Sequence, residues 1–194
     1  MNDGSSAVRR RVTEPFLKAR FALWLADRGA TRIAIAVDGA EPRAAEVKDL
    51  LCSGGYDFDH SPRTRTAYVG DYLKLATSIS VSARPGLDIR ATFSDGRELL
   101  AEAKGEKTVS GTSAGADWTS IAEIIGQLLL GASDADAAAL LALVLPNTER
   151  VARFARRLAE NRFLLRIPVY VSVVDSLGEV REIGQNLPLV TSSS

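Results

Sequence analysis

A short segment without any polar side chain places the strongest constraint on the fold. Residues Ala138 to Leu145 are all apolar, and Pro146 and Asn147 end the segment. The segment is too short for a typical buried helix and suits a strand, and a strand with no polar position must be covered on both faces. The chain is therefore expected to contain a central sheet that lies between layers of helices.

The periodicity of apolar residues predicts four helices around this strand. The first covers Thr13 to Arg28, where apolar side chains recur at helical spacing. A second is expected over residues 41–51, and a third from Ser120, which forms a possible capping box with Glu123, to Gly131. A fourth helix should follow Asn147.

Other segments have the alternation or the β-branched content of strands. They lie at residues 32–37, 75–84, 86–93 and 98–107, with two more around a turn within 167–183. Residues 60–72 are expected to form a loop. Helices mixed with strands and hairpins predict a three-layer α/β/α fold around a central mixed β-sheet.

Length and charge limit the domain organisation. The chain has 194 residues, of which 46% are hydrophobic, and its 24 Lys and Arg residues balance 24 Asp and Glu residues. This is enough for one domain with a buried core and excludes global disorder. We expect a flexible basic arm over residues 1–12, a single domain over 13–187 and a flexible tail over 188–194. Zero net charge argues against nucleic-acid binding by bulk charge but permits local basic patches.

Several function classes can be set aside. The single Cys52 cannot form an intramolecular disulfide or a Cys-based zinc site, and no apolar stretch reaches the about 18 residues of a membrane span, so we expect a cytoplasmic protein without a membrane partner. Ser113 lies in a G-x-S-x-G pattern, but the single His60 precedes it, whereas the α/β-hydrolase order places His after Ser.

Three charged residues on a predicted hairpin carry the strongest chemical signal. Asp95-Gly96 predicts the turn, which places Asp88 opposite Ala103 to within about one residue. Side chains two positions apart on a strand share a face, so Glu102 and Lys104 should point toward one site with Asp88. Charges inside apolar strands indicate metal binding or catalysis, although a surface ion pair on an edge strand is the alternative.

The same tripeptide pattern, Glu-x-Lys, occurs a second time. Glu46-Val47-Lys48 lies in a segment of helical periodicity, where side chains at i and i+2 diverge by about 200°. This copy cannot form one site, so the copy at Glu102 is the candidate.

The order of these features resembles the PD-(D/E)xK nucleases of the restriction-endonuclease-like superfamily. A helix with an early Glu, the Asp88 strand, a turn, the Glu102-Ala103-Lys104 strand and a helix with Gln127 follow in that order over roughly residues 13–174. The resemblance implies further site residues, Glu14 and Gln127. Glu14 could instead be an acid favoured by the helix dipole, and Gln127 a solvated flank.

The chain departs from the family pattern at two positions. Pro85 stands three residues before Asp88 rather than beside it, and Gly131 occupies the place where some members have Tyr. These departures leave the subfamily open.

The resemblance implies metal-dependent hydrolysis of DNA phosphodiester bonds, with products that carry a 5′-phosphate and a 3′-hydroxyl. Asp88, Glu102 and the carbonyl of Ala103 offer hard oxygen ligands suited to Mg²⁺ or Mn²⁺. Lys104 would orient the attacking water or stabilise the transition state. The alternatives are a non-catalytic nucleic-acid-binding or assembly module with the same fold, and an unrelated α/β protein in which these charges are structural.

Local arginines are the candidates for contact with the nucleic acid, which is expected to be DNA and could be RNA. One group lies in the 60–72 loop and the other on the fourth helix: Arg63, Arg65, Arg153, Arg156 and Arg157. A homodimer is a further possibility that the sequence leaves open.

Overall fold

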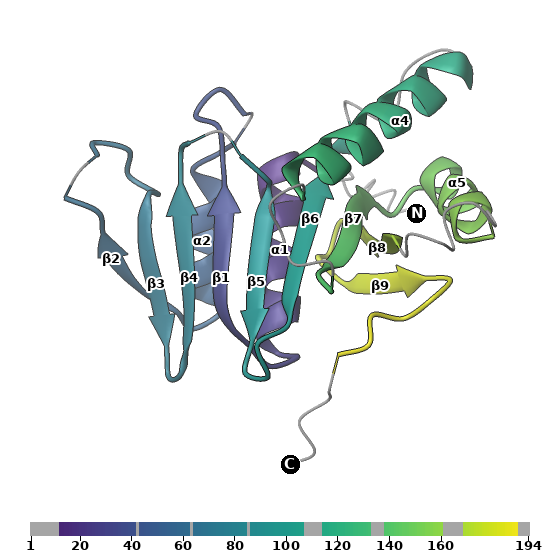
Figure 1. Ribbon diagram of the computed structural model, residues 1–194. Coiled ribbons are helices and arrows are strands. Elements are labelled where there is room, and N and C mark those ends of the chain that lie inside the picture. Colours follow the sequence, from purple (N-terminus) through teal and green to yellow (C-terminus); the bar gives the residue numbers. More distant parts are fainter. Residues whose placement is uncertain are drawn as a thin grey trace, which may run out of the picture.

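A nine-stranded mixed sheet runs through the middle of the computed structural model (Figure 1). The structure describes residues 12–41, 43–62, 64–84, 86–106, 114–132, 138–160 and 169–189. The helices are α1 (Glu14–Ala26), α2 (Glu46–Ser53), α4 (Ala114–Gly131) and α5 (Glu149–Ala159). The strands are β1 (Ala30–Ala36), β2 (Asp57–His60), β3 (Gly70–Lys74), β4 (Thr77–Ser82), β5 (Ile89–Phe93), β6 (Glu98–Ala103), β7 (Leu140–Pro146), β8 (Val169–Val174) and β9 (Val180–Ile183).

The strand order across the sheet is β2-β3-β4-β1-β5-β6-β7-β8-β9. β1 and β4 pair in parallel, as do β6 with β7 and β7 with β8, while the remaining neighbours are antiparallel. The expected mixed sheet in an α/β protein is therefore confirmed. β1 and β6 both run antiparallel to β5, so they end at the edge where β5 begins.

Helices lie on both faces of the sheet. α1 and α2 cover one face, and α4 and α5 lie on the other (Figure 1). β7 joins the two cores, since Ala142 and Val144 belong to the core under α1 while Leu141 and Leu143 pack in the core that contains Ile124 of α4. This two-sided burial explains why the strand has no polar side chain.

α1 is buried around nearly its whole circumference. The hydroxyl of Thr13 accepts a hydrogen bond from the backbone N–H of Phe16 and caps the helix, and Pro15 occupies the first turn. The helix contacts α2 and the strands from β5 to β9 as well as β1. The buried side chains of α1 include that of Lys18, so this helix carries a charge into the interior.

Some predicted boundaries are wrong. α4 begins at Ala114, so Ser120 lies inside the helix and cannot cap it, and α2 begins at Glu46 rather than at residue 41. The expected 60–72 loop contains the start of β3, and β2 ends within it at His60. The strand expected over 75–84 is shorter, because Leu75 and Ala76 form the turn between β3 and β4.

Within the described residues, we find no helix with the length and apolar character needed to cross a bilayer.

The turn between β3 and β4 contains a strained leucine. Leu75 is fully exposed and has a φ of 51°, in the left-handed region that residues other than glycine rarely adopt because of the Cβ atom. We predict that Leu75→Asn raises the free energy of unfolding by about 0.5–1 kcal/mol, because Asn tolerates this conformation. Thermal unfolding should show a rise of about 1–4 °C. Leu177→Asn, at an exposed turn without positive φ, should give no gain, and equal gains at both positions would contradict the strain argument.

Candidate active site

The candidate site lies at the edge of the sheet where β1 and β6 end and β5 begins. The first turn of α1 reaches the same edge, since the backbone N–H of Glu106 donates to the carbonyl of Val12 at 2.9 Å. Gly105 permits this approach, because a Cβ there would lie 2.8 Å from the backbone nitrogen of Glu14. Residues that are distant in sequence therefore meet at one point.

The strand register brings Asp88 and Glu102 together. Ile89 pairs with Ala101, so Asp88 and Glu102 are the next opposed positions, within the one-residue margin that the hairpin predicted. Asp88 Oδ2 accepts a hydrogen bond from the backbone N–H of Ala103 at 2.9 Å, and the Asp88 carboxyl group lies close enough to Glu102 to raise its pKa. Both residues are buried, with 8% and 5% of their surface exposed.

Lys18 lies at the centre of the cluster and was not predicted from the sequence. Its ammonium nitrogen is 2.7 Å from Asp88 Oδ1, 2.9 Å from Glu41 Oε1, 2.9 Å from the carbonyl oxygen of Ala36 and 3.4 Å from Glu14 Oε1. Only 1% of Lys18 is exposed. The sequence did not mark it, because Lys18 follows Glu14 by four residues, which is the spacing of an ordinary ion pair on a helix surface.

Glu14 and Lys104 complete the cluster. Glu14 Oε1 lies 3.7 Å from Lys104 Nζ, and both side chains are about one fifth exposed, at 20% and 19%. The expectation that Glu14, Asp88, Glu102 and Lys104 converge agrees with this geometry. Lys104 also keeps contact with solvent, so its ammonium is accessible to a substrate.

The environment shifts the protonation equilibria of the cluster. Burial raises the pKa of Glu102 to about 8, and the charge and hydrogen bond of Asp88 add to this rise, while Lys104 and Lys18 oppose it. Burial also raises the pKa of Glu14, against the opposing effect of Lys18 and Lys104. For Lys18, burial lowers the pKa, but Asp88, Glu41 and Glu14 outweigh it and keep the ammonium charged.

Gln127 does not join the cluster in the described part of the chain. It lies on α4 with an exposed side chain, and no hydrogen bond connects it to the described acids and lysines of the site. Gly131, at the end of α4, packs against Leu87, where an added Cβ would lie 2.7 Å from the Leu87 side chain. A larger residue at this position would require the Leu87 side chain to move.

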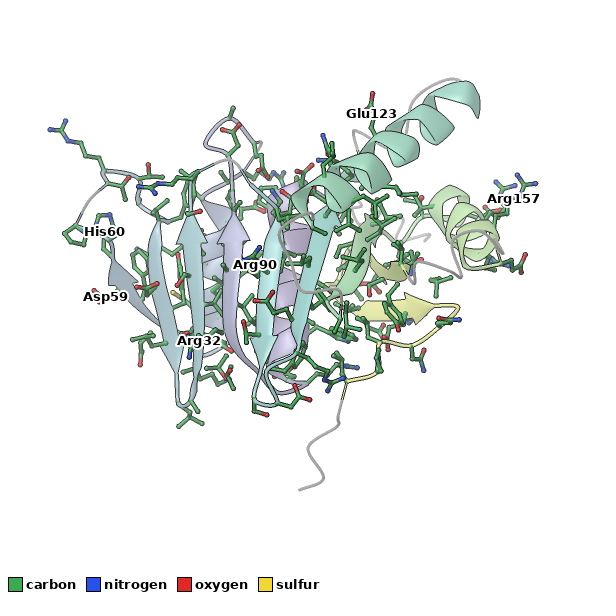
Figure 2. The ribbon with its side chains drawn as sticks, viewed as in Figure 1. Arg32, Asp59, His60, Arg90, Glu123 and Arg157 are labelled. Atoms are coloured by element: carbon green, nitrogen blue, oxygen red, sulfur yellow. The ribbon has the colours of Figure 1, made fainter. Side chains whose placement is uncertain are left out.

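The arginines proposed from the sequence do not form one surface with the site. Arg65 lies between β2 and β3 at one edge of the sheet, whereas the exposed Arg153, Arg156 and Arg157 lie on α5, which contacts β8 and β9 at the other edge. Figure 2 shows Arg157 at that other edge. Arg63 lies outside the described residues. The two groups of arginines lie at opposite edges of the sheet and do not form one continuous surface.

A groove that the sequence analysis missed adjoins the cluster. It has a volume of about 360 Å³ and is lined by Ala34, Ala36, Ser82, Arg84, Leu87 and Arg90 among others. Ala36 connects the two features, since its carbonyl accepts the hydrogen bond from Lys18. Arg84 and Arg90 are exposed, and Figure 2 shows Arg90 on the sheet face opposite α1 and α2. Among the described residues that line the groove, none carries a carboxylate.

The second Glu-x-Lys copy lies on a helix, as predicted. Glu46 and Lys48 belong to the first turn of α2. Glu46 lies 3.5 Å from Arg43, whereas the Lys48 ammonium lies over the Phe58 ring, 4.0 Å from its centroid. The two side chains thus have separate partners.

Comparisons with protein-family models, curated proteins and solved structures find no significant match. The functional argument therefore rests on geometry. Within the described residues, no three His, Cys, Asp or Glu side chains are arranged to hold a metal ion directly. The expected ligand set has only two side chains, the carboxylates of Asp88 and Glu102, together with the Ala103 carbonyl. A search for three side-chain ligands therefore does not test it.

The raised pKa of Glu102 gives a prediction about stability. The folded chain keeps a proton on Glu102 up to about pH 8, whereas the unfolded chain loses it near 4.5. The unfolded state therefore binds fewer protons in this window, and stability contributed by Glu102 falls as the pH rises through it. Glu102→Gln, measured by urea unfolding in EDTA, should become more stable than the native chain by on the order of 1–2 kcal/mol at pH 8.5, with a smaller difference at pH 5. A difference that does not change with pH would refute the assignment.

Proposed function

We propose that the protein is a metal-dependent nuclease that hydrolyses DNA phosphodiester bonds. The observation that carries the proposal is that the buried Asp88 and Glu102, at opposed positions of the β5–β6 hairpin, lie next to the partly exposed Lys104 ammonium. Two acids on adjacent strands and a lysine two positions after one of them match the PD-(D/E)xK pattern.

The topology supports the same proposal. α1, β1, β5, β6, α4 and β7 follow in chain order, β5 and β6 form an antiparallel hairpin, and β7 pairs in parallel with β6. This is the order of the expected elements, with α2 and β2 to β4 inserted between β1 and β5. This order supports the proposal that Asp88 and Glu102 act as the two acids of a PD-(D/E)xK site.

The charge of the cluster fits one divalent cation. When all groups are ionised, the four carboxylates Glu14, Glu41, Asp88 and Glu102 and the two ammonium groups Lys18 and Lys104 leave two negative charges. The proton retained by Glu102 shows how strongly a positive charge is favoured between the two acids. Asp88, Glu102 and the Ala103 carbonyl would hold Mg²⁺ or Mn²⁺, which supplies charge neutralisation at the phosphate and a more acidic bound water.

The chain's own groups have separate tasks in this proposal. Lys104 places a positive charge where the scissile phosphate or the attacking water would lie. Glu14 forms an ion pair with Lys104, with Oε1 3.7 Å from Nζ, and would hold the ammonium near the site. The N–H of Ala103 holds Asp88 Oδ2, so the carboxylate of Asp88 is oriented before substrate binds.

We predict that Glu102→Gln and Lys104→Ala each reduce nicking of supercoiled plasmid in Mg²⁺ or Mn²⁺ by at least about 100-fold, because they remove a ligand charge or the cation at the phosphate. Matched changes on α2, Glu46→Gln and Lys48→Ala, should leave the rate within a few-fold. EDTA provides the blank.

Activity that survives both changes in the site but is lost with the α2 changes would show that the proposed site lies on the wrong element. Tight DNA binding without any metal-dependent cleavage by the native chain would favour the non-catalytic binding module instead.

The arginine groove is the proposed contact for the DNA backbone next to the scissile phosphate. Arg84 and Arg90 line it, its described lining residues include no carboxylate, and Ala36 joins it to the cluster. Arginine guanidinium groups bind phosphate oxygens in bidentate geometry, which suits them to position a strand without reading its sequence.

We predict that Arg84→Ala with Arg90→Ala weakens duplex binding in a Glu102→Gln background and lowers the slope of log K against log salt by about 1–2. Fluorescence anisotropy at several salt concentrations measures both. Arg181→Ala is the control, since Arg181 is exposed on β9 and is paired with Glu179. An unchanged slope in the double variant, or an equal loss with Arg181→Ala, would remove the groove from the DNA path.

A further inference from the structure

The Lys18 ammonium group occupies a cage of oxygen atoms. Three carboxylate oxygens and one carbonyl oxygen surround it at 2.7 to 3.4 Å, from Asp88, Glu41, Glu14 and Ala36. Hard divalent cations select this donor set of carboxylate and backbone oxygens. The cage therefore has the chemistry of a cation site, and the cation in it belongs to the chain itself.

The cage is more than a solvent-exposed ion pair. Lys18 is 1% exposed, and an uncompensated charge at that depth would cost several kcal/mol. Asp88 uses Oδ2 for the Ala103 N–H and turns Oδ1 toward the ammonium. Glu41 Oε1 accepts from both Lys18 and the Asp38 N–H, while its buried Oε2 has no hydrogen-bond partner. An oxygen with a free lone pair thus adjoins the ammonium.

We propose that Lys18 is a positioning residue that acts as a built-in cation. Its ammonium fills the position that a second metal ion would take beside Asp88, so the cluster has room for one divalent ion between Asp88 and Glu102. The consequence that cleavage uses a single metal ion rests on the proposed nuclease function. The occupancy of the cage by Lys18 is independent of that function, because the occupancy can be measured without substrate.

The spacing of the cage is consistent with this role. Its oxygens lie at the distances of N–H···O hydrogen bonds, longer than the about 2.0–2.6 Å of Mg²⁺ or Ca²⁺ ligation. This explains why no three acidic side chains among the described residues are arranged for direct metal binding. Loss of the ammonium would allow the flexible carboxylates to contract around an ion.

The test counts Mn²⁺ ions bound per chain by the full-length protein without DNA, using isothermal titration and the electron paramagnetic resonance signal of free Mn²⁺. Lys18→Met should bind one ion more than the native chain, because three carboxylates then lack their cation. Lys48→Met, which removes a lysine from the surface of α2, should leave the count unchanged.

A second variant covers the case in which Lys18→Met does not fold. Lys18→Met with Glu14→Gln lowers the excess negative charge by removing the most distant carboxylate, at 3.4 Å, and should also gain one ion. Circular dichroism monitors folding with and without Mn²⁺, and folding that depends on Mn²⁺ supports the inference. Failure of both variants to fold even with Mn²⁺ would overturn it, since an ion that replaces the ammonium should restore the cage.

The counts separate this inference from the proposed function. A native chain that binds no ion, with one ion gained in Lys18→Met, supports the built-in cation and removes the metal from the proposed nuclease. Two ions in the native chain, or no gain in a folded variant, would overturn the inference and leave the nuclease proposal standing.

Discussion

The buried charge of Lys18 connects the architecture to the site. Its ammonium ties α1 to the end of β1 through Ala36, to the start of β5 through Asp88 and to the turn that carries Glu41. Removing one partner of such a buried network leaves an uncompensated charge and costs about 3–5 kcal/mol. The polar groups that hold this edge of the sheet in place are therefore also the groups of the candidate site. A shift of α1 along the sheet would disrupt the packing and the site together.

The proton on Glu102 and the ammonium of Lys18 solve one electrostatic problem in two ways. Four carboxylates in a partly buried cluster repel one another, and positive charge must be supplied for the chain to fold. Lys18 supplies a permanent positive charge, whereas the raised pKa of Glu102 lets that carboxyl hold a proton that is lost as the pH rises. Glu102 lies near Lys104, whose side chain is partly exposed to solvent.

The sequence predicted the elements whose patterns are local. α1, the hairpin of β5 and β6 and the strand β7 follow from apolar periodicity, the Asp95-Gly96 turn and the absence of polar residues. β2 and β3 were missed because exposed Asp57, Asp59 and Asp71 give them the composition of a loop. Asp88, Glu102 and Lys104 were predictable from hairpin register. Lys18 and Glu41 were not, because Lys18 follows Glu14 by four residues and resembles an ordinary helix ion pair, and only tertiary structure brings Glu41 to it.

The two Glu-x-Lys copies show why a short motif becomes informative only with its surroundings. On β6 the backbone directs both side chains to one edge, where the paired strand adds Asp88 and the buried helix adds Glu14 and Lys18. On α2 the same residues diverge, toward Arg43 and the Phe58 ring. Burial separates the two copies, because it brings Glu102 close to Asp88 and raises the Glu102 pKa, whereas water screens such repulsion at a surface.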